Sequence, residues 1–276
     1  MLVTTDVIWQ LYPFTCCFQT MFQTILVKNI FENDMKAFTL ISSLLISNTA
    51  IAIDVEHTST PINIDGVAES AWDKATWQNM PYLMDGTLPG SDKDFKGRYR
   101  LLWDEDYLYL QADIVDDVLI DTHPNPTEKY WDDDALEVFI DSDASGGNHQ
   151  FNHTAFAYHI GLDNQAADYG PDKKAHLYTD HLVSNWKRST TAPYNITWEV
   201  AIKLYPNDYQ EGAQNTQLKL TEKQVVGFML AYCDNDGSKV REHFMGSHEI
   251  QPVNGSRNLG YIDADVFGKI TLLPKK

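Results

Sequence analysis

Residues 131–141 read WDDDALEVFID, and this stretch is the most informative part of the chain for its fold. An aromatic residue and three aspartates run directly into a segment with a period of two, which is typical of a β-strand. Successive side chains of a strand point to opposite faces, so Leu136, Val138 and Ile140 form one apolar face. Glu137 then lies on the opposite face between apolar neighbours, where a carboxylate needs a polar partner.

The pairing of Trp131 with Glu137 suits a sugar. A flat ring covers the apolar C–H face of a pyranose, and a fixed carboxylate accepts hydrogen bonds from its hydroxyls. We therefore predict that Trp131 stacks on a ligand and that Glu137 accepts from it. The alternatives are a core position for Trp131 and an ion pair of Glu137 with Arg98, Arg100 or a lysine.

Similar strand-like runs recur along the chain, separated by clusters of Asp, Gly, Asn and Pro. They lie at 97–103, 107–114, 135–141, 153–162, 181–188, 196–204, 225–233, 239–245 and 268–273. A short strand followed by a turn is expected at 61–66 and one or two helical turns at 67–77. Strands that follow one another without long helices predict an all-β fold, an antiparallel β-sandwich of jelly-roll type.

The N-terminal region predicts export. Residues 35–52 combine a basic start, a short apolar stretch and an Ala-Ile-Ala ending, which is the pattern of a signal peptide. Residues 1–34 would then precede the true start as an over-extended N-terminus, with a genuine extension as the alternative. We predict a single domain over residues 53–276 in a protein that is secreted or periplasmic in a bacterium.

Charge and cysteine content narrow the partners. A formal net charge of −18 argues against nucleic acid and anionic membranes, and it is compatible with neutral glycans and calcium. Cys16 and Cys17 lie before the predicted mature start, which leaves Cys233 without an internal disulfide partner. Because Cys233 follows an apolar run, we expect it to be a buried and inert thiol.

The order of these features resembles the family 9 carbohydrate-binding modules, which are appendages of secreted xylanases and related hydrolases. The resemblance covers nearly all of residues 61–273. Its landmarks are IDG at 64–66 with Trp72, LWDEDYLY at 102–109, Trp131 with Asp134 and Glu137, WEVAIK at 198–203, VGF at 226–228, Asp234, and FGKI at 267–270. The resemblance implies a β-sandwich that holds a sugar between two aromatic rings.

The resemblance also implies roles for single residues. Trp131 matches the first ring and Glu137 the hydroxyl-binding carboxylate, while Asn258 and Tyr261 match the family's asparagine and second ring. His159 aligns with a family arginine, so it is a predicted sugar donor that departs from the pattern. The alternative for His159 is a strand histidine satisfied by its neighbours.

Three functions follow as hypotheses. The first is a non-catalytic protein that binds a mono- or oligosaccharide or a plant or algal polysaccharide, needs no cofactor, and acts beside a co-secreted glycoside hydrolase in polysaccharide utilisation. The second is a glycoside hydrolase that pairs Glu137 with one aspartate of 132–134. The third is a haem-binding β-sandwich, with axial ligands drawn from His153, His159, Met229 and Met245.

Calcium is the one metal that the sequence suggests. Asp141 and Asp143 begin a loop, DSDASGG, with oxygen donors at alternate positions. We favour a turn capped by aspartate side chains there, with a structural calcium ion bound by Asp141 and Asp143 as the open alternative. Related modules carry structural calcium, and Asp116, Asp117 and residues 132–134 are further candidate donors.

Overall fold

The computed structural model describes residues 52–276. The elements are β1 (Ile53–His57), η1 (Ser70–Lys74), β2 (Gln78–Asn79), β3 (Tyr82–Gly86), β4 (Phe95–Trp103), β5 (Leu108–Asp116), β6 (Ala135–Asp141), β7 (Phe156–Gly161), β8 (Ala166–Tyr169), β9 (Ala175–Leu177), η2 (Thr179–His181), β10 (Leu182–Arg188), β11 (Ile196–Ile202), β12 (Val225–Asp234), β13 (His243–Gly246), η3 (Ala264–Val266) and β14 (Gly268–Leu272). The helices η1–η3 are short 3₁₀ turns, so the predicted all-β class is confirmed.

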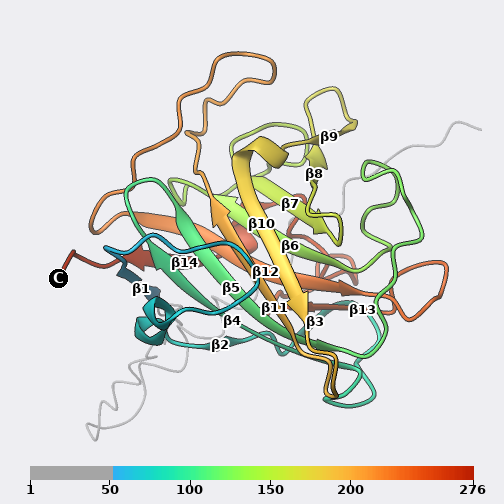
Figure 1. Ribbon diagram of the computed structural model, residues 1–276. Helices are drawn as coiled ribbons and strands as arrows, with labels where there is room; N and C mark the ends of the chain where they lie inside the picture. The colour runs from blue at the N-terminus through green and yellow to red at the C-terminus, as the bar shows by residue number, and fades with distance from the viewer. Residues whose placement is uncertain (1–51) are drawn as a thin grey trace, which may run out of the picture. The chain divides into compact units, whose positions relative to one another are not determined.

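The strands form two layers joined by one strand (Figure 1). One layer runs β10–β11–β5–β4, with β2 on β4. The other runs β9–β8–β7–β6–β12, and β14 and β13 share the far edge of β12. Strand β1 pairs in parallel with β14 through its first half and with β4 through its second half, whereas the other pairings are antiparallel.

The main core lies between the two layers. The alternation predicted for β6 is present, because Leu136, Val138 and Ile140 belong to this core. The opposite face of β6 contributes to a second apolar cluster, which includes Phe139, Met229 of β12 and Phe267. The β6–β7–β12 sheet is therefore covered on both faces, and its outer face is where Glu137 lies.

The N-terminal segment covers the outer face of the other layer. Trp72 of η1 packs there with Leu102 and Tyr109. Buried Glu199 of β11 accepts from Trp72 Nε1 at 3.0 Å and from the Gly66 amide at 3.0 Å. These bonds hold the segment in place, and residues 61–64, expected as a strand, are irregular.

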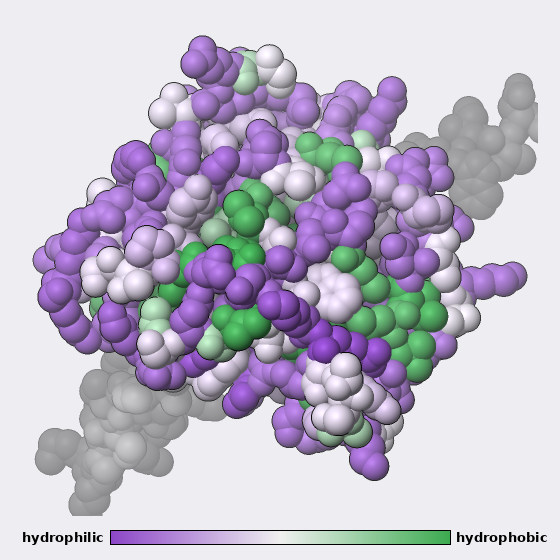
Figure 2. All heavy atoms as spheres, in the orientation of Figure 1, coloured by the Kyte–Doolittle hydropathy of each residue, from purple (hydrophilic) through white to green (hydrophobic). Residues whose placement is uncertain are grey.

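The surface and the chain boundaries complete the description. The face drawn in Figure 2 is largely hydrophilic, and apolar side chains reach it in small separate patches. Within residues 52–276, no helix has the length and hydropathy to cross a bilayer. The predicted over-extended N-terminus and all but the last residue of the predicted signal peptide lie outside the described residues, so these boundaries stay predictions.

Candidate functional site

A cavity of about 730 Å³ opens on the outer face of the β6–β7–β12 sheet. Glu137 of β6 and His159 of β7 lie opposite each other on its floor, and Asp168 of β8, one residue beyond the pairing partner of His159, also lines the cavity. The walls come from six separate segments and contain Asp85, Gly86, Tyr130, Trp131, Asp132, Gln150, Phe151, Tyr169, Lys173, Val240, Arg241, Asn258 and Tyr261.

The structure brings all five predicted sugar-binding residues to this cavity. Trp131 precedes β6, Glu137 and His159 lie on adjacent strands, and Asn258 and Tyr261 precede β14. The last segment approaches closely at Gly260, where a Cβ would come within 2.6 Å of the side chains of Met229 and Phe139 and would have to displace them. The roles of these residues in binding a sugar stay predictions.

The floor holds a carboxylate oxygen that accepts no hydrogen bond from residues 52–276. Glu137 is 2 % exposed, and its Oε2 lies 2.9 Å from His159 Nε2. The contact does not follow the direction of a ring N–H, so this buried oxygen has no hydrogen bond. The other ring nitrogen of His159, Nδ1, lies 3.3 Å from the Ala157 carbonyl oxygen. The alternative prediction paired Glu137 with an arginine such as Arg98 or Arg100. Arg98 instead donates to Asp113, and Arg100 donates to Gln111.

Aromatic side chains that sequence reasoning missed enlarge the walls. Tyr130 packs edge-on against both Trp131 and His159, with ring centroids 5.0 and 4.7 Å apart. Phe151 meets Tyr169 edge-on at 6.0 Å. Phe151 lies in the segment between β6 and β7, and Tyr169 ends the short strand β8, so only the general rule that loops and their borders carry binding residues could have pointed to them.

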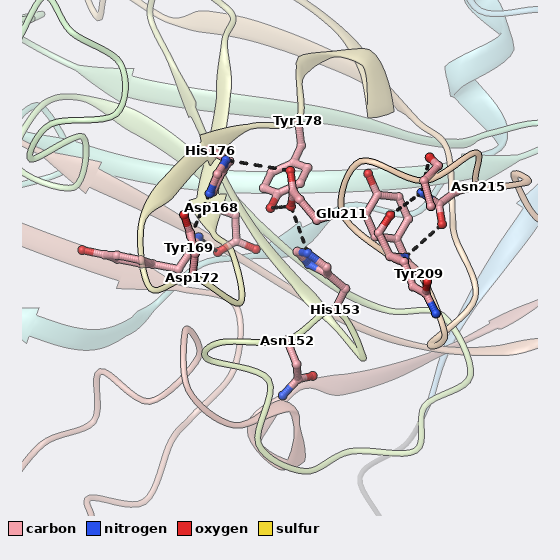
Figure 3. Close-up of polar contacts among 12 residues, drawn as sticks. Asn152, His153, Asp168, Tyr169, Asp172, His176, Tyr178, Tyr209, Glu211 and Asn215 are labelled. Carbon is pink, nitrogen blue, oxygen red and sulfur yellow. Dashed lines mark hydrogen bonds and ion pairs between the residues drawn. The ribbon is translucent and has the colours of Figure 1, made fainter.

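A network behind the wall braces the β8–β9 hairpin (Figure 3). Glu211, from the stretch between β11 and β12, accepts from Tyr178 Oη at 2.6 Å and contacts His153 Nε2 at 3.1 Å. His176 of β9 contacts Asp172 at 2.8 Å within the hairpin turn. These bonds fix the hairpin that carries Asp168 and Tyr169 to the cavity.

The pKa of Asp168 is unusual. Burial raises it to about 7, although Asp168 accepts from the amides of Ala157 and Tyr169, which favour its charged form. Asp168 is thus a carboxyl group that changes charge near neutral pH inside the cavity.

The four candidate haem ligands do not converge on the described cavity. Met229 and Met245 lie in the two different apolar clusters on opposite faces of the sheet. His153 is engaged with Glu211, and among the four candidate ligands only His159 lines the described cavity.

A second site joins the ends of three strands behind Trp131. Asp116 ends β5, Asp134 precedes β6 and Asp234 ends β12, and their carboxylate oxygens lie within 4.8 Å of one another. All three side chains are buried, and Asp234 Oδ2 has no hydrogen-bond partner in the part of the chain that the structure describes. Burial, together with the charge of neighbouring carboxylates, raises their pKa values to about 6, 8 and 9 respectively. This oxygen-only arrangement fits a calcium ion.

The loop of Asp141 and Asp143 is organised by its own hydrogen bonds. Asp141 accepts from the amides of Asp143 at 3.3 Å and Gly146 at 2.7 Å. Asp143 accepts from the Ser145 amide and from Asn207. A capped turn therefore explains this loop, and a calcium ion at Asp141 and Asp143 stays an untested alternative.

Comparison with known proteins identifies the family. Residues 64–275 match the family described as carbohydrate family 9 binding domain-like, which is most of the chain. The chain belongs to this family. A solved structure of a carbohydrate-binding module family 9 from Caldicellulosiruptor kristjanssonii in complex with cellotriose superposes with a TM-score of 0.59 at 18 % identity, over 82 % of this chain and 95 % of that one. A second solved structure of such a module from the same organism, in complex with glucose, gives 0.58.

Curated relatives are much longer than this family 9 chain. Endo-1,4-beta-xylanase A of Thermotoga neapolitana is 33 % identical over 216 residues, and that of Thermotoga maritima is 25 % identical over 216 residues. The match covers 78 % of this chain but 17 % of each relative. A putative carbohydrate-binding protein from Bacteroides uniformis has a TM-score of 0.51 at 11 % identity, over 80 % of this chain and 98 % of that one. These structural matches show the β-sandwich fold.

Proposed function

We propose that this family 9 domain binds a neutral sugar in the cavity, held between the rings of Trp131 and Tyr261 and oriented by Glu137. The observation that carries the proposal is Glu137 Oε2, a buried acceptor without a donor at the floor of a cavity with aromatic walls. A buried polar atom without a partner is costly, and a sugar hydroxyl would satisfy it. The complexes of family 9 modules with cellotriose and glucose support the same ligand class.

The charge of the cavity supports a neutral ligand. Asp85, Asp132, Glu137 and Asp168 line it, against Arg241 and Lys173. Arg241 is already paired with Asp85, so an acidic sugar would meet a net negative surface. Stacking against rings requires no charge on the ligand.

Replacing Glu137 by glutamine tests the orienting role. A neutral amide accepts more weakly than a carboxylate, so we expect Glu137→Gln to weaken glucose binding about tenfold, or about 1.4 kcal/mol. Calorimetric titration with glucose and cellotriose measures this, with the exposed Glu249→Gln as the matched control. Equal affinities for Glu137→Gln and the wild type would remove Glu137 from the site.

A glycoside hydrolase is the second candidate, and one observation favours it. Asp168, with its pKa raised to about 7, shares the cavity with Glu137, and two carboxyl groups in different environments can serve as acid and base. Of the three aspartates predicted as possible catalytic partners of Glu137, Asp132 lines the cavity. Asp133 and Asp134 instead accept hydrogen bonds from backbone amides outside it.

We expect binding without cleavage, because Asp168 is held by two backbone amides instead of facing a leaving group freely. Incubation of purified protein with xylan and cello-oligosaccharides, followed by chromatography of the products, measures this. Cleavage that disappears in Asp168→Asn would establish the hydrolase instead.

We also propose that Asp116, Asp134 and Asp234 hold a calcium ion with a structural role. Asp134 accepts from the Asn235 amide at 2.8 Å, and Asn235 donates to the Asp132 carbonyl at 2.6 Å. The same cluster therefore anchors the segment that carries Trp131. When bound, the ion would neutralise the three buried carboxylates and fix this wall of the cavity.

We also propose that the protein is exported and acts beside a co-secreted glycoside hydrolase. The signal-peptide pattern of residues 35–52 supports export. We expect the mature chain to begin near Ile53. Intact-mass spectrometry of protein recovered outside the cytoplasm measures the start. A mature chain that retains residues 1–34 would rule out this assignment.

A further inference from the structure

Arg241 brings a guanidinium to the cavity from a part of the chain in which no sugar-binding residue was predicted. It lies between β12 and β13, and its side chain is 8 % exposed. The guanidinium stacks on Phe244 at 4.0 Å. Nη2 donates to Asp85 Oδ2 at 3.1 Å, and Nη1 donates to Cys233 Sγ at 3.3 Å. The side chain is thus locked in one orientation.

Arg241 retains capacity to donate. A guanidinium has five N–H donors, and two nitrogens account for the bonds that Arg241 makes within the described residues. Its Nε makes no hydrogen bond within residues 52–276. Because Arg241 lines the cavity, the unused donors are available to a ligand there.

The donor and the acceptor lie close together across Cys233. The sulfur is 3.3 Å from Arg241 Nη1, and a carboxylate oxygen of Glu137 lies within 4.8 Å of the same sulfur. One small ligand can therefore meet both charges. Glu137 only accepts and Arg241 only donates, so the two groups impose opposite requirements on the oxygens that they contact.

Glu137 and His159 of the floor, together with buried Cys233, which does not line the cavity, offer three atoms that a transition metal could use. The guanidinium on the sulfur opposes that reading, because it already places a fixed positive charge against one of the three ligands. Burial also raises the pKa of the Cys233 thiol to about 12, so the ligand form of the sulfur is disfavoured.

We propose that Arg241 determines which sugar the cavity accepts. This rests on the proposed function. One hydroxyl of the sugar donates to Glu137, and an adjacent oxygen accepts from Arg241. The cavity then selects a neutral sugar with two free neighbouring oxygens, and it rejects an analogue that lacks either one.

The test is calorimetric titration of the whole protein with glucose and each of its monodeoxy analogues. We expect the wild type to bind at least one analogue about tenfold more weakly than glucose. In Arg241→Met, glucose affinity should fall to the level of the analogue lacking the oxygen that Arg241 contacts. That analogue should bind the variant and the wild type equally, so the discrimination disappears.

Arg98→Met is the matched control. Arg98 stacks on Trp77 at 4.1 Å and pairs with Asp113 at 2.6 Å, as Arg241 does with Phe244 and Asp85, but on the other layer of the sandwich. Its affinities and discrimination should equal those of the wild type. If Arg241→Met does not fold, Arg241→Lys replaces it in the same titrations. Lysine keeps the positive charge but lacks the planar guanidinium, so we expect reduced discrimination between the sugars.

The other outcomes are distinct. A purely structural role for Arg241 would weaken all the sugars equally and leave their ratios unchanged, which overturns the inference while sugar binding stands. Unchanged glucose affinity in both Arg241 variants also overturns it. A wild type that binds neither glucose nor cellotriose refutes the proposed function and, with it, this inference.

Discussion

Removing divalent cations near pH 8 should lower the melting temperature of the protein by roughly 5–11 °C. A ligand that binds only the folded state, present at a hundred times its dissociation constant, stabilises it by about 2.7 kcal/mol. For a domain of this size, 1 kcal/mol shifts the melting temperature by about 2–4 °C. The cause is the cluster of Asp116, Asp134 and Asp234, whose carboxylate oxygens lie within 4.8 Å of one another.

The effect should depend on pH with a definite sign. Burial raises the folded-state pKa values of these aspartates to about 6, 8 and 9, above an unfolded value of about 3.9. In chelator, their contribution to stability is complete below about pH 4 and is lost as pH rises through the folded-state values. Because calcium favours the charged carboxylates, its stabilisation should grow over the same range.

Melting curves with and without chelator, from acid to mild alkali, measure both effects. In Asp234→Asn we expect the calcium response to be lost, whereas Asp143→Asn should keep it. The reverse pattern would place the ion in the loop of Asp141 and Asp143. A wild type that melts identically in chelator, with no metal in elemental analysis, would contradict both sites.

Trp131→Ala should weaken every sugar ligand by about 1–3 kcal/mol, the range typical of a buried anchor at a binding site. Stacking supplies area with little directional preference, so the loss should be similar for glucose and cellotriose. Glu137→Gln and Arg241→Met should instead affect ligands according to their hydroxyls. Trp131 is half-buried at the cavity, and its removal leaves Tyr261 to stack alone.

Trp77→Ala is the control for this change. Trp77 is also half-buried, but it stacks between Arg98 and Arg100 on the other layer. Calorimetry should give wild-type affinities for Trp77→Ala. If Trp131→Ala binds as tightly as this control, the cavity is not the sugar site.

The strands with a clear period of two were predictable from the sequence. The pattern of residues 135–141 gave the bounds of β6 and the face of each side chain, because burial between two sheets forces alternation. The short strands β1, β2, β3, β8 and β9 escaped prediction. They make few pairs and lie at edges or at the junction between sheets, so tertiary pairing defines them more than local pattern does.

The candidate site was predictable only where the family resemblance reached it. That resemblance pointed to Trp131, Glu137, Asn258 and Tyr261, which the fold brings together from three separate segments. It placed His159 where the family has an arginine, whereas the structure brings Arg241 to the same cavity from a different turn. No local pattern marks Arg241, because its role depends on which strands lie side by side.

The most direct test of the central claim is a crystal structure of the protein with cellotriose. We predict a sugar ring between Trp131 and Tyr261, with one hydroxyl donating to Glu137 Oε2. A sugar bound at another surface, or an empty cavity in crystals saturated with a ligand that the protein binds in solution, would contradict the account.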